Sequence, residues 1–216
     1  MLVNRAANCI YTDDMAVPAI ILAAGASRRL GRPKQLVHMA RETLLGRTIR
    51  VVSEAGAKPI VVVLGAHREA IEAGVDLTGV EVVFNCDWEQ GIASSIRAGL
   101  EAVGALGSGI SGVLLLACDQ PALTAAHLRK LISLHESASR NAGSVTVASA
   151  YAGVAGIPAI FPASRFPGLL ELTGDTGARH LLRESAREVV CEPFVGGDAD
   201  IDTPRDIGAL SALERE

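Results

Sequence analysis

The sequence predicts an α/β domain with a mostly parallel β-sheet and helices on both of its faces. Short apolar runs alternate with amphipathic helical patterns along the chain, which is the order that successive βαβ units produce. The run Ile60–Leu64 reads IVVVL and has no polar residue to face water, so its strand belongs at the centre of a parallel sheet. A length of 216 residues is enough for one well-buried domain, whereas two full domains would be cramped.

The expected strands are short runs rich in apolar and β-branched residues. In chain order they are Ala19–Ala23, Ile60–Leu64, Val80–Phe84, Val113–Ala117, Ser144–Ala150, Ile157–Phe161 and Val189–Pro193.

The expected helices fall mostly between these strands. In the first of them, apolar residues recur every three or four positions, as on one face of a helix. Thr124 and Thr203 are suited to be N-caps, and Pro204 to be a first helical residue. The expected helices are Glu42–Ala55, His67–Ala73, Ile92–Val103, Thr124–Ser137, Gly177–Glu184 and Pro204–Leu213.

Composition excludes several classes of protein. The chain is 49% hydrophobic and 20% charged, as in a globular protein, and its formal net charge is −4. No long basic stretch exists to neutralise a nucleic-acid backbone, and no apolar run approaches the roughly 20 residues that span a bilayer, so we expect neither nucleic acid nor membrane as a partner. The four cysteines form no CxxC pair and the five histidines show no metal-ligand spacing. We therefore expect reduced thiols and a cytoplasmic location.

Residues 1–15 are set apart from the domain. They lack a basic segment followed by a clean apolar run, so they do not read as a signal peptide. We expect either a disordered extension or a natural start at Met15, with the domain covering residues 16–216.

Ligands of parallel α/β sheets bind beyond the carboxyl ends of the strands, which directs attention to the segment after each strand. The first strand leads into AGASRRLGRPK, which matches neither G-x-x-x-x-G-K-[ST] nor G-x-G-x-x-G. Its small residues would let backbone N–H groups approach an anion, and its cations Arg28, Arg29, Arg32 and Lys34 can neutralise phosphate oxygens. On composition alone, a phosphate-binding loop and a solvated basic turn are equally good interpretations.

The next two strand ends carry weaker signals. Gly65 follows the second strand and suits either close approach of a ligand or a tight turn. After the third strand, the side-chain amides of Asn85 and Gln90 and the hydroxyls of Ser94 and Ser95, with Gly91 beside them, can read a base or a phosphate. Trp88 in the same segment is more often a packing residue than a stacking one.

Acidic residues follow the fourth strand and recur near the end of the chain. Asp119 ends the apolar run LLLACD, where a carboxylate is costly unless it is paired or bound to a cation such as a divalent metal bridging substrate phosphates. The alternative is an aspartate that caps a helix. Asp198, Asp200 and Asp202 alternate in GGDADIDTP, so one of them can complete a metal site with Asp119 while the others are solvated.

These segments together resemble the small nucleotidyltransferase family, whose signature is LAAGxSxRMGxxK. The nearest branch is similar to molybdenum cofactor cytidylyltransferase and related molybdenum-hydroxylase maturation proteins. The first motif, LAAGASRRLGRPK, is widely shared, whereas the later blocks are more specific. They are NCDWEQGIASSI, LLLACDQPALT, GIPAIFP followed by LTGDTGAR, and DIDTPRDI, and the resemblance runs from about Pro18 to Leu213.

The resemblance implies a Rossmann-like single domain that transfers a nucleotidyl group from an NTP, with Mg²⁺, to the terminal phosphate of a pterin cofactor. It further implies a molybdenum hydroxylase as the client of the product. The implied catalytic residues are Lys34, Arg28 and Asp119, and the implied metal ligands are Asp119 and Asp202. The implied nucleotide-binding residues are Leu22, Ala23, Ala24, Gly25, Gly31, Lys34, Gly65, Asn85, Gln90, Gly91 and Ser94, and the implied acceptor-binding residues are Gly156, Asp175 and Arg179.

Two departures bear on the substrate. Guanylyl-transferring relatives usually read LAGG where this chain has Leu22-Ala23-Ala24-Gly25, and the methyl group of Ala24 should crowd a purine more than a pyrimidine, which favours CTP. Leu30 replaces the usual methionine, a conservative change. A guanylyltransferase, a sugar- or polyol-phosphate nucleotidyltransferase and a non-catalytic cofactor-binding chaperone stay open as alternatives.

Overall fold

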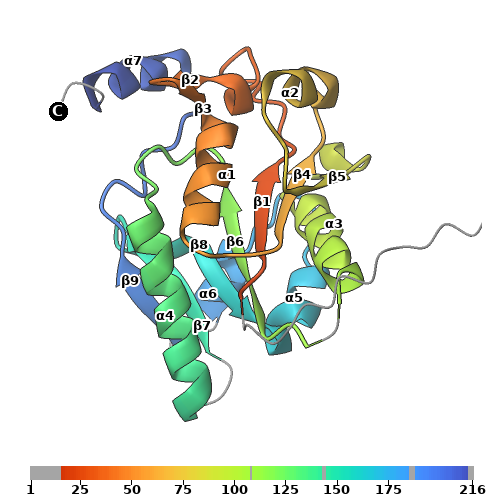
Figure 1. Ribbon diagram of the computed structural model, residues 1–216, viewed down its shortest axis with the longest axis vertical. Coiled ribbons are helices and arrows are strands. Elements are labelled where there is room, and N and C mark those ends of the chain that lie inside the picture. Colours follow the sequence, from red (N-terminus) through yellow and green to blue (C-terminus); the bar gives the residue numbers. More distant parts are fainter. Residues whose placement is uncertain (1–15, 108, 143–144, 185–187, 214–216) are drawn as a thin grey trace, which may run out of the picture.

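The seven-stranded sheet forms the centre of the molecule in the computed structural model, which describes residues 16–107, 109–142, 145–184 and 188–213. The strand order is β5-β4-β1-β6-β8-β7-β9. The strands are β1 Ala19–Ala23, β4 Ile60–Leu64, β5 Glu81–Phe84, β6 Gly112–Ala117, β7 Thr146–Tyr151, β8 Val154–Pro162 and β9 Val189–Pro193. Figure 1 shows β1, β4 and β6 side by side and running in one direction.

The prediction of a mostly parallel sheet is confirmed, with one strand as the exception. Strands β5, β4, β1 and β6 pair in parallel, as do β7 and β9, whereas β8 is antiparallel to both β6 and β7. The two-residue turn Ala152–Gly153, with φ of +49° and +76°, folds β7 directly back onto β8. Since a hairpin of this kind leaves no room for a crossover helix, the pairing has to be antiparallel.

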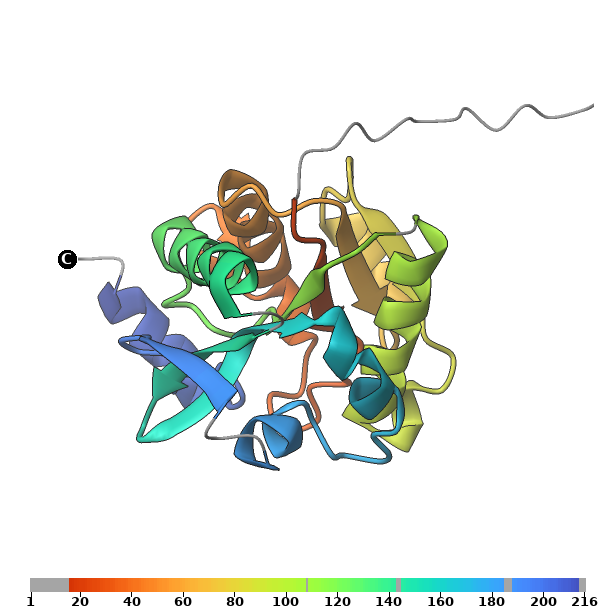
Figure 2. The ribbon, with the colours of Figure 1, turned by 90° about the horizontal axis from the view of Figure 1, so that it is seen from below.

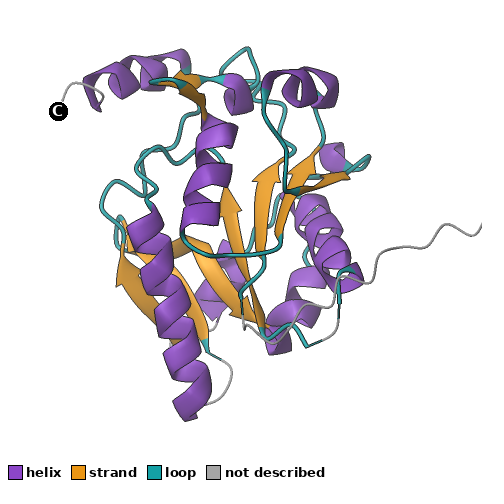
Figure 3. Ribbon diagram, viewed as in Figure 1, coloured by secondary structure: helices purple, strands orange, loops and turns teal. Residues whose placement is uncertain are grey.

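Helices cover both faces of the sheet, as Figures 2 and 3 show. The helices α1 Leu44–Glu54, α2 Arg68–Gly74 and α4 Ala125–Ala142 pack on one face. The helices α3 Ile92–Ala105, α5 Phe166–Leu170 and α6 Arg179–Glu184 pack on the other. Successive residues of β1 alternate between these two cores, and all five are buried. This explains the unbroken apolar runs in the central strands.

Local chemistry sets several element boundaries. Helix α1 begins at Leu44, two residues later than predicted, because the Thr43 hydroxyl accepts a hydrogen bond from the Gly46 amide (3.1 Å) and caps it. The two residues before Leu44 form strand β3 (Glu42–Thr43), which pairs with β2 (His38–Met39). Thr124 caps α4 as predicted, with its hydroxyl 3.2 Å from the His127 amide.

The C-terminal helix α7 (Pro204–Leu213) completes the domain beside the β2–β3 hairpin (Figure 1). At its start the Asp206 carboxylate accepts hydrogen bonds from the Thr203 amide (2.7 Å) and the Thr203 hydroxyl (2.9 Å). The predicted N-cap therefore donates to Asp206. This packing brings the segment around Asp202 to the carboxyl end of β6, where the Ile201 amide donates to the Asp119 carbonyl (3.0 Å).

Short elements complete the described chain: η1 Lys34–Leu36, η2 Trp88–Gln90 and η3 Ala163–Arg165. Among the described residues, no helix is both long enough and apolar enough to cross a bilayer. The predicted extension, residues 1–15, lies outside the described residues.

Candidate functional site

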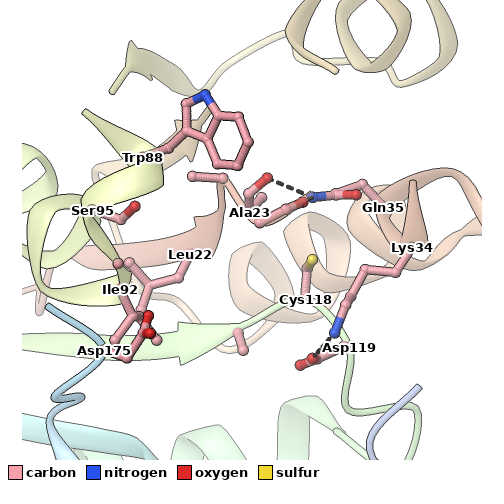
Figure 4. Close-up of a pocket in the computed structure, with 14 residues that line it drawn as sticks. Leu22, Ala23, Lys34, Gln35, Trp88, Ile92, Ser95, Cys118, Asp119 and Asp175 are labelled. Carbon is pink, nitrogen blue, oxygen red and sulfur yellow. Dashed lines mark hydrogen bonds and ion pairs between the residues drawn. The ribbon is translucent and has the colours of Figure 1, made fainter. Parts of the chain in front are cut away.

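Two adjoining cavities open at the carboxyl ends of β1 and β6. The first has a volume of about 280 Å³ and is lined by the loop after β1, the start of α3 and the end of β6 (Figure 4). The second has a volume of about 520 Å³ and is lined by the other side of β6, Tyr151 and the segment around α6. Residues common to both linings mark where the cavities meet. They are Leu22, Ile92, Ala117, Asp119 and Asp175.

The loop after β1 is held in place by Gln35 and Ser27. The Gln35 side-chain amide, 1% exposed, donates to the carbonyls of Ala23 (2.6 Å) and Gly25 (3.1 Å). The Ser27 hydroxyl accepts a hydrogen bond from the Lys34 amide (3.0 Å). These contacts fold the loop back on η1, so the Lys34 side chain extends into the first cavity (Figure 4).

Lys34 binds two carboxylates that are far apart in the sequence. Its ammonium lies 2.7 Å from Asp119 Oδ2 and 2.7 Å from Asp202 Oδ1. Burial by itself would lower the pKa of Lys34, but the charges and hydrogen bonds of the two aspartates raise it above its usual value. Asp119 is therefore paired, which answers the difficulty of a carboxylate at the end of a buried strand.

Asp202 also contacts a second cation. Its Oδ2 lies 2.8 Å from the exposed guanidinium of Arg29. Burial acts to raise the pKa of Asp202, but hydrogen bonds and charge from Lys34 and Arg29 outweigh it and lower the pKa. Asp202 is thus ionised at neutral pH and available to a cation.

Asp200 lies near the same carboxylates, on the wall of the second cavity. Its pKa is raised to about 6, first by desolvation and then by the negative charges of Asp119 and Asp202. Asp200 therefore carries a proton more readily than an ordinary aspartate at mildly acidic pH.

This raised pKa leads to a prediction about stability and pH. The folded protein holds the Asp200 proton up to about pH 6, whereas the ordinary aspartate pKa of 3.8 applies to the unfolded chain. Stability should therefore fall as the pH rises from about 4 to 6, and Asp200→Asn should remove part of that fall. Thermal unfolding in EDTA at several pH values measures how the stability of each protein changes with pH. Asp198→Asn is the control, since it removes a charge from the same segment outside the cavity lining, and equal pH profiles for the two variants would refute the prediction.

The donor set suits a hard divalent metal. Asp119 and Asp202 already hold one cation, the Lys34 ammonium, between them at hydrogen-bond distance. Across the described ranges, no group of three or more His, Cys, Asp or Glu residues is arranged to hold a metal. A two-carboxylate site fits an ion such as Mg²⁺, which completes its shell with water and substrate phosphates.

The first cavity brings together about half of the predicted nucleotide-binding residues. Those in its lining are Leu22, Ala23, Ala24, Gly25, Lys34 and Gly91, whereas Gly31, Gly65, Asn85, Gln90 and Ser94 lie outside both linings. Arg28 is exposed and also lies outside them. Gly31, at φ +74°, closes the turn that begins at Ser27. A Cβ at Gly65 would lie 2.6 Å from the Trp88 Cβ, so this glycine admits Trp88.

Asn85 and Ser94 brace the loop between β5 and α3. The buried Asn85 amide donates to the hydroxyls of Ser94 (2.8 Å) and Ser95 (2.9 Å), and its oxygen accepts from the Asp87 amide (3.0 Å). Gln90 donates to Asp87 Oδ1 (2.8 Å). These contacts hold the polar groups of Asn85, Gln90 and Ser94 within the loop and outside the cavity lining, whereas Ser95, a candidate from the same segment, lies in the wall of the first cavity.

Gly91 lines the first cavity and packs against the Gly174 loop. Its φ and ψ are 103° and 176°, a conformation open essentially only to glycine, and a Cβ there would collide with the Gly174 carbonyl. The Ala93 amide donates to that carbonyl (3.1 Å). The segment Gly174-Asp175 is therefore docked on the start of α3, which places Asp175 at the boundary of the cavities.

Gly91→Ala should lower the free energy of unfolding by at least about 1–3 kcal/mol, because alanine is strained in this conformation and would displace the Gly174 loop. Chemical denaturation measures the change. Gly104→Ala in the same helix is the matched control, since no heavy atom lies within 4 Å of its added Cβ, and it should be neutral or stabilising. Equal stability of the two variants would contradict the assigned packing.

A polar network forms one wall of the second cavity. Arg179 donates to the Tyr151 hydroxyl (3.2 Å), with its guanidinium 5.8 Å from the ring centroid. The Tyr151 hydroxyl in turn donates to the Ile157 carbonyl (3.0 Å), which also accepts from the Gln120 amide (3.2 Å). Gly156 lies outside the lining, and a Cβ there would collide with the Tyr151 hydroxyl.

Sequence reasoning missed three residues of this site: Arg29 as a partner of Asp202, Gln35 and Tyr151. Gln35, in the middle of η1, and Tyr151, at the end of β7, are single polar residues that nothing in the sequence pattern distinguishes from solvated ones. Arg29 was visible as a cation, but its partner is 173 positions away.

Comparison with known proteins identifies the fold and the family. The model of the MobA-like NTP transferase domain matches residues 19–189. Nicotine blue oxidoreductase of Paenarthrobacter nicotinovorans is 32% identical over 182 residues, which cover 80% of this chain and 84% of that protein. A probable molybdenum cofactor guanylyltransferase of Opitutus terrae is 36% identical over 111 residues, which cover 51% of this chain and 52% of that protein.

Solved structures agree with this result. Rv0371c from Mycobacterium tuberculosis H37Rv superposes with a TM-score of 0.77 at 31% identity, covering 90% of this chain and 96% of that one. Another structure of Rv0371c is described as a complex with manganese (TM-score 0.73, 28% identity, covering 90% and 97%). The chain therefore belongs to the MobA-like NTP transferase domain family, a nucleotidyltransferase family that includes molybdenum cofactor guanylyltransferases.

Proposed function

We propose that this protein transfers CMP from CTP to the terminal phosphate of molybdopterin or its molybdenum-loaded form, with Mg²⁺, and releases pyrophosphate. The observation that carries the proposal is the convergence of Lys34, Asp119 and Asp202. Asp119 lines both cavities, Lys34 lines the first, and Asp202, outside both linings, binds Lys34. A transferase needs its cations at the point between donor and acceptor, because negative charge accumulates there in the transition state. A molybdenum hydroxylase is the client that we expect to receive the product.

In the proposed reaction an oxygen of the acceptor phosphate attacks the α-phosphorus of CTP. The new P–O bond forms as the bond from the α-phosphorus to its bridging oxygen breaks, and the electron pair leaves with pyrophosphate. Lys34 neutralises the α-phosphoryl oxygens, and Arg28 neutralises the outer phosphates from the loop. A Mg²⁺ ion held by Asp119 and Asp202 would supply charge neutralisation and orientation. The acceptor phosphate is already ionised near pH 7, so the protein needs no general base.

The second cavity suits a flat acceptor with an anionic group. Its floor is apolar, with Leu22, Ile96 and Leu115, and its wall carries Arg179, which is oriented by Tyr151. We assign acceptor contacts to Arg179 and Asp175, and we assign to Gly156 the role of admitting Tyr151 beside them.

The preference for CTP rests on Ala24. This residue is 5% exposed and lies in the lining of the smaller cavity, so its methyl group takes space beside the bound base. Ala24→Gly should therefore raise the affinity for GTP relative to CTP by roughly 10-fold, as expected for one methyl group in a tight pocket. Competition between the two nucleotides in thermal-shift titrations measures the ratio of their affinities. If Ala24→Gly leaves this ratio unchanged, Ala24 is not the source of the preference.

The experiment that tests the function is thermal unfolding with each of the four NTPs, with and without Mg²⁺. A ligand at 100 times its Kd raises the free energy of unfolding by about 2.7 kcal/mol. We expect a Mg²⁺-dependent shift with CTP, followed by pyrophosphate release when the pterin acceptor is added. A larger shift with GTP would indicate a guanylyltransferase, and release only with a sugar or polyol phosphate would indicate that class.

Two further outcomes would contradict transferase activity. CTP that binds without any pyrophosphate release on addition of the acceptor would favour a cofactor-binding chaperone. Since one relative is named an oxidoreductase, NADH and NADPH belong in the same panel. Stabilisation by either of them without metal, and none by an NTP, would contradict the proposal.

A further inference from the structure

Lys34 and the proposed metal have the same two ligands. The ammonium contacts Asp119 Oδ2 and Asp202 Oδ1, both at 2.7 Å, and the side chains of Lys34 and Asp119 are only 16% and 17% exposed. A divalent ion coordinated by both carboxylates would have to lie close to the position of this ammonium. Two cations repel each other strongly at such a distance in a partly buried site. Occupation of the two carboxylates by Lys34 and by a metal is therefore mutually exclusive in this geometry.

Lys34 can leave the carboxylates without refolding of the loop. Its amide is bound to Ser27 Oγ, and the next residue, Gln35, is anchored to two carbonyls of the preceding loop. The backbone is thus held on both sides, while the ammonium lies at the end of a flexible four-carbon side chain. Rotation of that side chain within the first cavity moves the charge from the carboxylates towards the position of a bound phosphate.

We propose that Lys34 competes with the divalent metal for Asp119 and Asp202, and that a nucleotide phosphate resolves the competition by binding the Lys34 ammonium. This inference rests on the proposed function. It makes the metal–nucleotide complex the form that the site accepts, and metal binding and nucleotide binding reinforce each other. The coupling is reciprocal, so the metal raises the affinity for nucleotide by the same factor. Lys34 would then act twice, first as an occupant of the metal site and then as a ligand of the α-phosphate.

The test is the affinity for Mn²⁺ alone, measured from the electron paramagnetic resonance signal of free Mn²⁺. Lys34→Met should raise this affinity at least about 10-fold, within the usual range of such couplings. Lys34→Gln is a second variant in case the first is unstable. Arg29→Met is the matched control, because Arg29 also pairs with Asp202 (2.8 Å) but makes no contact with Asp119. If loss of one positive charge were the whole cause, Arg29→Met would raise the affinity as much as Lys34→Met, and the proposal would be overturned.

A second measurement adds CMP, which supplies an α-phosphate but chelates Mn²⁺ weakly by itself. We expect CMP to raise the Mn²⁺ affinity of the native protein by a larger factor than that of Lys34→Met, since only the native protein has a lysine to displace. Equal increases in Mn²⁺ affinity for the two proteins would overturn the proposal.

If Lys34→Met binds Mn²⁺ no more tightly than the native protein does, competition is refuted while the metal site stands. If neither the native protein nor any variant binds Mn²⁺, with or without CMP, the competition, the metal site and the proposed function are all refuted.

Discussion

Replacement of Lys34 by alanine is expected to lower the turnover number by roughly 10²-fold or more, equivalent to about 3 kcal/mol of transition-state stabilisation. Negative charge builds up on the α-phosphoryl oxygens as the leaving group departs, and the Lys34 ammonium lies in the first cavity, 2.7 Å from Asp119, which lines both cavities. Pyrophosphate release at saturating CTP, Mg²⁺ and acceptor measures the effect.

The control for this variant is Arg32→Ala, which removes an exposed positive charge from the same loop. It should change the turnover number little, because Arg32 lines neither cavity, pairs with neither Asp119 nor Asp202, and is assigned no phosphate contact. A near-normal rate for a folded Lys34→Ala protein, or an equal loss in Arg32→Ala, would refute the assigned role of Lys34. The apparent affinity for metal should move in the opposite direction to the rate, since Lys34→Ala frees Asp119 and Asp202.

Asp119→Ala should abolish metal-dependent turnover. Asp119 is the second residue after β6 and lines both cavities, so its loss removes one of only two proposed protein ligands of the metal. The same change should lower the free energy of unfolding, because Asp119 is an ion-pair partner of a mostly buried lysine and not an unpaired charge. Turnover as a function of Mg²⁺ concentration, together with chemical denaturation, measures both effects.

Asp198→Ala provides the comparison for Asp119. It removes an exposed carboxylate from the C-terminal segment that carries Asp202, but Asp198 lines neither cavity. Its Mg²⁺ dependence should match that of the native protein. An unchanged Mg²⁺ dependence in Asp119→Ala would exclude Asp119 as a metal ligand and leave it as a structural partner of Lys34.

The central part of the fold was predictable because its signals are local. An unbroken apolar run such as Ile60–Leu64 can be buried on both sides only at the centre of a sheet, and the structure places it between β1 and β5. Thr124 caps a helix through its own hydroxyl and a neighbouring amide, so its role is also contained in a few adjacent residues. Features that depend only on neighbouring residues can be predicted without knowledge of the tertiary structure.

The antiparallel direction of β8 and the bracing role of Asn85 were harder to predict from the sequence. The sequence around Ala152–Gly153 permits a tight hairpin, but the choice between a hairpin and a crossover depends on which strands are free to pair. Asn85 carries the same groups whether it binds a ligand or a loop. Only the positions of Ser94, Ser95 and Asp87 show that its hydrogen-bonding groups are all occupied within the protein.

For the site, the chemistry that is present could be read from the residues alone: a small-residue loop with cations after the first strand, a carboxylate after the fourth, and alternating aspartates near the end. Which of these groups meet depends on the folded arrangement of the chain. It joined Lys34, Asp119 and Asp202 across separations of 85 and 168 positions, and it docked the Gly174 loop on Gly91. The physical reason is that charge and side-chain chemistry belong to single residues. Distance, pairing and the pKa changes that follow depend on how the helices pack around the sheet.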